Sequence, residues 1–144
     1  MNYTEFINLM QKHGAMFAPA ATQQSIALAN SALQQIHAAI LPQSIIDFYV
    51  QCGGINLGSG YIFGPSEITR GTKYPIPSIT MLNMELSGLP GIRGKTIFGR
   101  NDLFWFAFNA FGEFTMLDNL NLNVLRKYDN IFNAMSDCLI AGKI

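Results

Sequence analysis

The sequence predicts an α+β fold, in which a mostly antiparallel sheet is flanked by helices within a single domain covering residues 1–144. Three observations lead to this prediction. Apolar residues recur at helical spacing through the first third of the chain, strand patterns cluster in residues 95–118, and a helical pattern closes the sequence. Strands that follow one another, rather than alternating with helices, favour antiparallel pairing.

The first predicted helix begins at Tyr3, because Asn2 and Glu5 have the spacing of a capping box. Gly14 is expected to end it, and Ala15 to Ala21 reads as a connector. The apolar residues that recur at helical spacing are Tyr3, Phe6, Ile7 and Met10.

Two more helices are predicted before residue 55. Thr22 is expected to cap the second, which should continue to Leu41 because Pro42 disfavours helix in the residue before it. Its apolar seam consists of Ile26, Ala29, Leu33, Ile36 and Ile40. Pro42 suits the first turn of the third helix, and Gly53-Gly54 is expected to terminate that helix in the left-handed conformation. Its apolar face consists of Ile45, Ile46, Phe48, Tyr49 and Cys52.

The centre of the chain gives weaker patterns. A short strand is predicted at residues 61–63, a loop from Pro65 to Pro77, and a turn at residues 89–91. Residues 79–86 fit either a short helix or an extended segment, and the sequence does not decide between them.

The last third gives the clearest patterns. Strands are predicted at 95–98, 103–108 and 114–118, with a four-residue hairpin loop at 109–112. Both faces of the strand at 103–108 are apolar, so we expect it to lie centrally and to be covered on both sides. The final helix is indicated by Ile131, Phe132, Met135, Leu139 and Ile140.

The composition excludes several classes of function. Charged residues make up 12% of the chain and the net charge is zero, which argues against nucleic-acid binding because that binding relies on excess Lys and Arg. The charges are unevenly spread, since residues 65–101 carry five basic and two acidic side chains, a net +3. Such a mildly basic centre suits a protein partner better than a polyanion.

The sequence also indicates where the protein is located and the state of its two thiols. The first residues do not resemble a signal peptide, and no apolar run is long enough to span a membrane. We therefore expect a cytoplasmic protein. Cys52 and Cys138 are expected to be buried thiols rather than a disulfide, and we expect no metal or other cofactor, because clustered ligand motifs are absent from the sequence.

No pattern in the sequence predicts catalysis. His13 and His37 stand in no recognisable motif, and the glycines of residues 53–64 lead into a strand rather than a phosphate-binding helix. Asp102 and Asp118 bracket a predicted hairpin and are open to an acid/base role, although binding to loop amides is the favoured interpretation. Trp105 is interpreted as a core residue, with a ligand pocket as the alternative.

Several of these features together resemble the SUKH superfamily, with the YrhA-like branch the most similar. The resemblance rests on Leu41-Pro42, on the F-Y-x-x-x-G-G pattern of residues 48–54, and on the F-G-x-x-D pattern of residues 98–102. An aromatic strand at 104–108, a turn at Gly112, a strand ending at Asp118 and a helix from Tyr128 to Leu139 follow in the same order. The match runs from about residue 21 to the C-terminus and contains no catalytic residues.

This resemblance implies an α+β fold and, in bacteria, an immunity protein that binds and neutralises a toxin. A non-enzymatic module of this kind needs an exposed surface with charged and aromatic residues. The predicted partner-binding residues are Asp47, Glu67, Arg70, Lys73, Arg93, Arg100 and Asp102. The alternatives are a regulatory or scaffold module that binds a host protein, and a small-molecule-binding domain. The toxin's identity and the oligomeric state are left open by the sequence.

Overall fold

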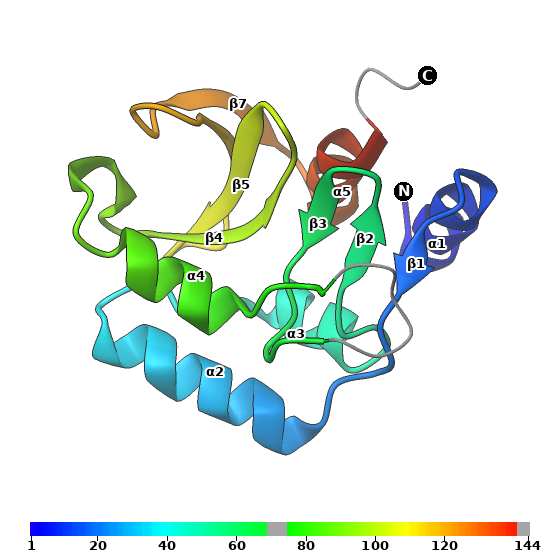
Figure 1. Cartoon of the computed structure of the whole chain (residues 1–144), viewed down its shortest axis with the longest axis horizontal. Helices are drawn as coiled ribbons and strands as arrows, with labels where there is room; N and C mark the ends of the chain where they lie inside the picture. The colour runs from blue at the N-terminus through cyan, green and yellow to red at the C-terminus, as the bar shows by residue number, and fades with distance from the viewer. Residues whose placement is uncertain (69–74, 141–144) are drawn as a thin grey trace.

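The predicted α+β fold class is confirmed. The computed structural model describes residues 1–68 and 75–140, and within them five α-helices accompany a seven-stranded antiparallel sheet (Figure 1). The strands lie in the sheet in the order in which they occur in the chain, so each pairs with its sequence neighbour. In chain order the elements are α1 (Tyr3–Lys12), β1 (Met16–Phe17), α2 (Gln23–Gln35), α3 (Gln43–Tyr49), β2 (Ile55–Leu57), β3 (Gly60–Ile62), α4 (Ile79–Leu86), the 3₁₀-helix η1 (Pro90–Ile92), β4 (Lys95–Arg100), β5 (Phe104–Asn109), β6 (Phe114–Asp118), β7 (Val124–Tyr128) and α5 (Ile131–Ile140).

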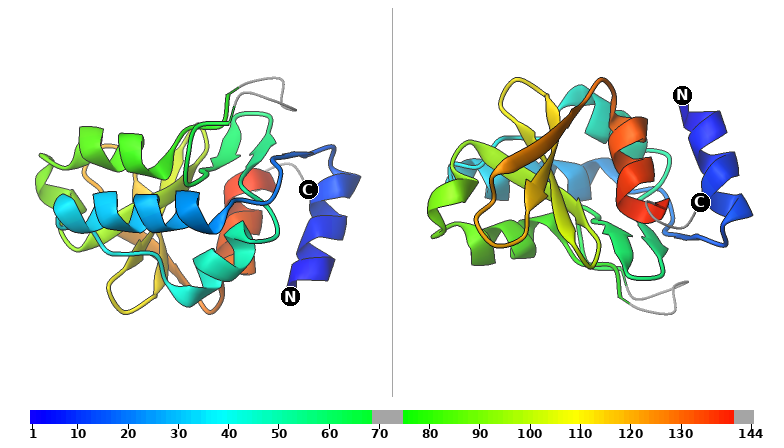
Figure 2. Two further views of the ribbon diagram at one scale, coloured as in Figure 1. Left: turned by 90° about the horizontal axis from the view of Figure 1, so that it is seen from below. Right: turned by 90° about the horizontal axis from the view of Figure 1, so that it is seen from above.

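The helices form two pairs around the sheet. α1 lies beside α5, where the rings of Phe6 and Phe132 are 5.3 Å apart, and α2 runs alongside α4 (Figure 2). α5 covers one face of the sheet closely. A Cβ atom added to Gly99 would lie 3.3 Å from Cys138 Sγ, and one added to Gly60 would lie 3.1 Å from a side-chain carbon of Leu139. The face of β3 and β4 that carries these glycines therefore looks toward α5.

α1 and α2 end in the same hydrogen-bonded motif with different residues at its left-handed position. In α1, Ala15 N–H donates to Met10 O and Gly14 has φ +82°. In α2, Ala38 N–H donates to Leu33 O and His37 has φ +60°. This pattern of bonds is the Schellman motif, which usually places glycine at that position.

The prediction that α2 continues to Leu41 is wrong because this motif stops the helix at Gln35. Ile40, the last residue of the predicted apolar seam, is consequently 55% exposed. The Thr22 cap is confirmed, since its side chain accepts the Ser25 N–H at 3.1 Å. The capping of α1 by Asn2 is confirmed in the same way, with Glu5 N–H as the donor at 2.8 Å.

Replacing His37 with glycine is expected to raise the free energy of unfolding by about 1 kcal/mol, because glycine adopts positive φ without steric cost. His13 occupies the preceding position of the same motif in α1 with φ −88°, so His13→Gly is the matched control and should give no gain. Urea unfolding of both variants measures the difference. Equal stabilities of His37→Gly and the wild type would contradict the strain assigned to His37.

The expected role of Gly53-Gly54 as the stop of α3 is also wrong. α3 ends earlier, at Tyr49, and these glycines instead permit close backbone approach. A Cβ on Gly53 would lie 2.5 Å from Pro19 O, and Gly53 O would lie 2.3 Å from a Cβ on Gly64. The loop after α3 is thus packed between two other segments where no side chain fits.

Four elements were not predicted, or not decided, from the sequence. Residues 15–21 contain the two-residue strand β1, residues 55–57 form β2, and residues 124–128 form β7. Residues 79–86 are a helix, α4, whose first turn is capped by Ser78. β7 is an edge strand whose side chains are mostly exposed, and it carries a bulge as well as Arg126 and Lys127. Bulges and charges of this kind protect a free sheet edge from unwanted strand pairing.

Asn83 of α4 completes the hydrogen bonding of β4 where β3 does not reach. β3 pairs only with the last two residues of β4, Gly99 and Arg100. Asn83 is 1% exposed, and its side chain both accepts the Ile97 N–H at 2.8 Å and donates to Ile97 O at 2.9 Å. A second donation, to Ile79 O at 2.8 Å, ties the amide to its own helix. One side chain thus substitutes for the missing strand.

The expectation that the aromatic strand is covered on both sides holds for only part of its length. β5 lies between β4 and β6, and its residues Phe106, Ala107 and Phe108 are fully buried. Trp105, near the start of the strand, is only partly buried. Trp105 packs against the core, so its interpretation as a core residue holds in part, and its exposed part belongs to the surface described next.

Candidate protein-binding site

Three side chains of the types that dominate protein interfaces lie side by side on the sheet. The register pairs Tyr61 of β3 with Arg100 of β4, and Arg100 with Trp105 of β5. Directly opposed residues in antiparallel strands project from the same face. Because the neighbouring Gly60 and Gly99 look toward α5, alternation places Tyr61 and Arg100 on the face opposite α5. We refer to Tyr61, Arg100 and Trp105 as the Arg100 cluster.

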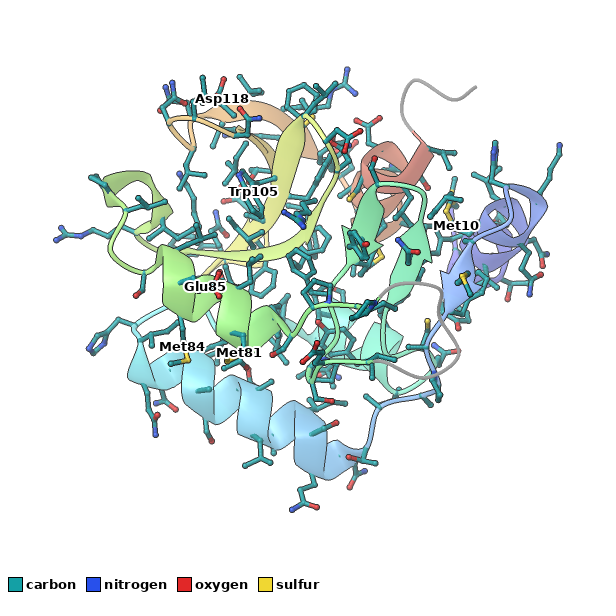
Figure 3. The ribbon with its side chains drawn as sticks, viewed as in Figure 1. Met10, Met81, Met84, Glu85, Trp105 and Asp118 are labelled. Atoms are coloured by element: carbon teal, nitrogen blue, oxygen red, sulfur yellow. The ribbon has the colours of Figure 1, made fainter. Side chains whose placement is uncertain are left out.

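The guanidinium group of Arg100 lies between two aromatic rings. Its central carbon is 5.9 Å from the Tyr61 ring centroid and 5.7 Å from the Trp105 ring centroid. Both distances are within the range of a cation–π interaction. Arg100 is exposed, while Tyr61 and Trp105 are partly exposed, so the cluster is accessible to another molecule. Trp105 lies on β5, well away from α1 and α2 (Figure 3).

The turn that connects Arg100 to Trp105 is held by Asn101. Its side-chain oxygen accepts the N–H groups of Leu103 and Phe104, each at 2.9 Å, and its amide nitrogen donates to Cys138 O at 3.1 Å. The last bond anchors the turn to α5. Asn101 was missed from the sequence, although an Asx turn directly after a strand is a recognisable signal.

Exposed apolar residues adjoin the Arg100 cluster. Leu103, two residues before Trp105, is 64% exposed. Leu117 of β6 pairs with Trp105 and also with Val124 of β7, which is 43% exposed. The row of paired residues runs from Tyr61 to Val124 across five strands, but Leu117 within it is fully buried. The exposed residues around the cluster therefore combine a cation and two aromatic rings with the apolar side chain of Leu103. Such a mixture is typical of the centre of a protein interface.

The predicted partner-binding residues lie on several different elements. Arg100 ends β4 and Asp102 is exposed in the turn after it, so these two are close in the chain. Asp47 is on α3, where it accepts a hydrogen bond from Gln43, and Glu67 is exposed between β3 and α4. Arg93 is exposed in the turn before β4. The two remaining predictions fall outside the described residues, and they are Arg70 and Lys73.

Asp118 binds loop amides, as the favoured interpretation expected. Its carboxylate accepts the Leu120 N–H at 2.7 Å, and its backbone pairs with Asn123 at the end of β6. Asp102 makes no hydrogen bond or ion pair within the described residues and lies beyond the β5–β6 pairing of Phe104 with Asp118. The two carboxyl groups have different environments, and only Asp118 has a structural role.

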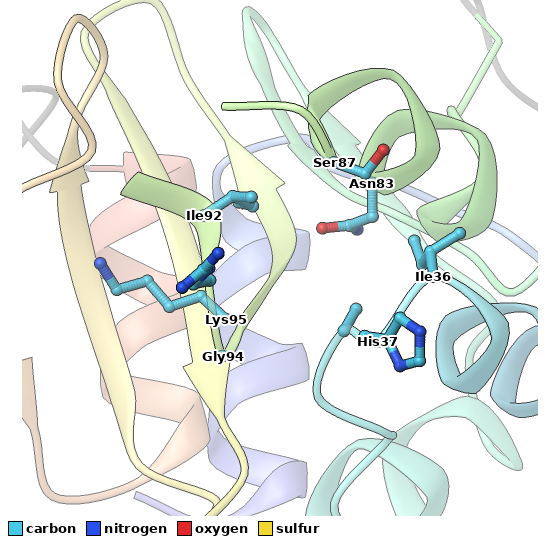
Figure 4. A pocket seen from close by; sticks show the side chains of 9 residues that line it. Ile36, His37, Asn83, Ser87, Ile92, Gly94 and Lys95 are labelled. Atoms are coloured by element: carbon cyan, nitrogen blue, oxygen red, sulfur yellow. The ribbon is translucent and has the colours of Figure 1, made fainter. Parts of the chain in front are cut away.

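One cavity of the described residues lies away from the Arg100 cluster and is small. It has a volume of about 190 Å³ and lies where the ends of α2 and α4 meet the turn from η1 into β4 (Figure 4). Ile36, His37 and Ser87 line it together with Arg93. Pockets for drug-sized ligands usually measure roughly 300–1,000 Å³. Trp105 does not line this cavity, so the alternative of a ligand pocket at Trp105 gains no support from it.

Both cysteines are buried free thiols, which confirms that expectation. Burial raises the pKa of the Cys138 thiol. It also raises the pKa of the Cys52 thiol, which is less deeply buried. Hydrogen bonds to the carbonyls of Tyr61 and Gly54 oppose these shifts without cancelling them. The thiolate forms are therefore disfavoured in the folded protein.

Raised thiol pKa values predict a loss of stability in alkaline solution. The protonated thiols contribute their full stability below the unfolded pKa, about 8.5, and this contribution is lost as the pH rises above that value. The urea midpoint should therefore fall between pH 8 and 9.5, and it should fall less steeply in Cys138→Ala. Parallel pH profiles of the variant and the wild type would contradict this assignment.

Metal-binding groups, membrane-spanning helices and known relatives were also sought for this chain. Within residues 1–68 and 75–140, no group of three or more His, Cys, Asp and Glu side chains is placed to hold a metal ion. Across the same residues, none of the helices combines the length and the apolar character that crossing a bilayer requires. Comparison of the chain with protein-family models and with curated proteins gives no match.

Proposed function

We propose that the protein is a non-enzymatic binding module for another polypeptide, and that it acts in the bacterial cytoplasm as an immunity protein that neutralises a toxin. The observation that carries the binding part is the Arg100 cluster. Trp, Tyr and Arg are the residues most enriched among interface hot spots, and here all three are adjacent and accessible. Their mutual packing fixes their positions before a partner arrives, which lowers the entropy cost of binding.

The toxin part of the proposal rests on the resemblance to the SUKH superfamily. The residues that carry it have clear structural positions in this chain. Phe48 and Tyr49 are buried at the end of α3, and Tyr49 O–H donates to Phe63 O at 2.7 Å. Such positions support a shared fold, and a shared fold alone does not determine function. The proposal therefore needs a direct functional test.

To neutralise a toxin through this surface, the protein needs to bind it tightly and does not need to catalyse a reaction. A protein that docks through one face of its sheet blocks whatever lies beneath it on the toxin, either the active site or the surface that binds the target. The Arg100 cluster would form the centre of this contact, and Asp102, two residues beyond Arg100, would form part of its polar rim. Asp47, Glu67 and Arg93 lie on other elements and would be peripheral to a contact centred there.

Co-expression with the product of the adjacent open reading frame tests the proposal. If that product is a toxin, the protein should restore growth and co-purify with it as a complex. An Arg100→Glu, Trp105→Ala double variant should fail to restore growth, while Lys127→Ala, on the exposed edge strand, should restore it. Full toxicity in the presence of the wild-type protein, with no complex formed, would contradict the immunity function. Stable capture of a host protein unrelated to toxins would favour the regulatory alternative instead.

A further inference from the structure

Arg126 and Arg100 differ in whether their charge is paired with a carboxylate. Arg126 forms a salt bridge with Asp137 at 2.7 Å, and this is the sole salt bridge within the described residues. Arg100 accordingly has no acidic partner there. Its guanidinium group lies over the rings of Tyr61 and Trp105, and the face of an aromatic ring is not a conventional hydrogen-bond acceptor. Within the part of the chain that the structure describes, the guanidinium N–H groups of Arg100 have no hydrogen-bond acceptor and are available to another molecule.

Among residues 1–68 and 75–140, no carboxylate is paired with Arg100. Asp118, at the end of β6, is engaged by the amide of Leu120. Asp102 follows Arg100 by two residues, yet its side chain forms no ion pair with it. Arg100 is therefore oriented by its neighbours while its charge remains unpaired.

We infer that the Arg100 cluster binds a carboxylate side chain, from an Asp or Glu that the partner polypeptide presents beside an apolar residue. This inference deepens the proposed function and rests on it for the identity of the partner. Arginine offers parallel N–H groups that match the two oxygens of a carboxylate. The partner's apolar residue would pack on Leu103 and the exposed part of Trp105.

Charge argues for a protein carboxylate rather than a polyanion. A nucleic acid or a polyphosphate needs several cations together, whereas this cluster contributes only one. The exposed carboxylate of Asp102 stands close to it in the chain and would repel an extended row of phosphates. A single acidic side chain with apolar neighbours can pair with the Arg100 cation and pack against the aromatic rings at the same time.

Short peptides test the inference without the natural partner. Trp105 is the only tryptophan of the chain, so its fluorescence reports on this site. The probes are the capped tripeptides Ac-Leu-Glu-Leu-NH₂ and Ac-Leu-Gln-Leu-NH₂, which differ only in the charge of the central side chain. We expect the Glu peptide to change the emission of Trp105 in a saturable way at millimolar concentration. The Gln peptide should bind at least threefold more weakly.

Two variants and one competitor make the outcomes decisive. Arg100→Gln should remove the preference for the Glu peptide, and Arg100→Lys should retain part of it. Equal binding of both peptides, or an unchanged preference in Arg100→Gln, would overturn the inference. Inorganic phosphate that competes as strongly as the Glu peptide would also overturn it, by showing a general anion site. Because the peptides are independent of any toxin, failure of the co-expression experiment alone would refute the immunity function and leave the carboxylate site standing.

Discussion

Replacing Asn83 with leucine is expected to lower the free energy of unfolding by about 3 kcal/mol, the largest stability change predicted for a single side chain. The substitution keeps a similar volume but leaves the N–H and C=O of Ile97 without partners in a buried environment. Each unsatisfied buried group costs roughly 1–3 kcal/mol. Urea unfolding, followed through the fluorescence of Trp105, measures the loss as a lower midpoint.

The control for this prediction lies on the same helix. Glu85 is exposed on α4 and its side chain makes no hydrogen bond or ion pair within the described residues, so Glu85→Gln should change the unfolding free energy by less than about 0.5 kcal/mol. Both variants should keep the wild-type dependence on urea concentration, because the surface exposed by unfolding is unchanged. A loss below 1 kcal/mol for Asn83→Leu would show that Ile97 finds another partner, which would contradict the role given to Asn83.

Replacing Trp105 with alanine is expected to weaken the complex with the partner polypeptide by at least about 30-fold, which corresponds to about 2 kcal/mol and is the threshold for a hot spot. Two losses combine in this variant. The partner loses the exposed indole surface, and Arg100 loses one of the two rings that orient it. Titration calorimetry with the purified partner measures the affinity directly.

Matched substitutions separate these two effects. Trp105→Phe keeps a ring beside Arg100 and should lose less affinity than Trp105→Ala. Lys127→Ala removes an exposed charge from β7, outside the cluster, and should change the affinity by less than about threefold. An equal loss for Lys127→Ala and Arg100→Ala would indicate general charge attraction instead of a local contact.

Local sequence signals predicted a large part of the fold. The caps supplied by Asn2 and Thr22 are found as expected, because a side-chain oxygen three residues before a backbone donor is a short-range interaction. The hairpin of β5 and β6 and the helix at 131–140 are likewise confirmed, since both are specified by patterns within about ten residues.

Features that depend on distant residues escaped prediction. β7 has mostly exposed side chains, so no apolar alternation marks it as a strand, and only its pairing with β6 defines it. The end of α2 is set by His37 in a position where glycine would have been the signal. Asn83 gives no indication in the sequence that it binds Ile97, fourteen residues away and on another element.

The candidate site was partly predictable for the same reason. The sequence predicts Arg100 as an exposed cation, but it marks Tyr61 only as part of a strand and Trp105 only as core. Their meeting depends on the register of three strands, which the sequence does not reveal. The bulge between Ile97 and Gly99 shifts that register, and without it Arg100 would not face Trp105.

One measurement tests most directly whether the Arg100 cluster is the docking site. When the chain alone is labelled with ¹⁵N, its spectrum contains a single indole N–H signal, from Trp105, and an unlabelled partner adds no signal of its own. On addition of the partner, this signal should shift or broaden in step with complex formation. A complex that forms while the Trp105 signal keeps its position and width would place the interface elsewhere and contradict the account.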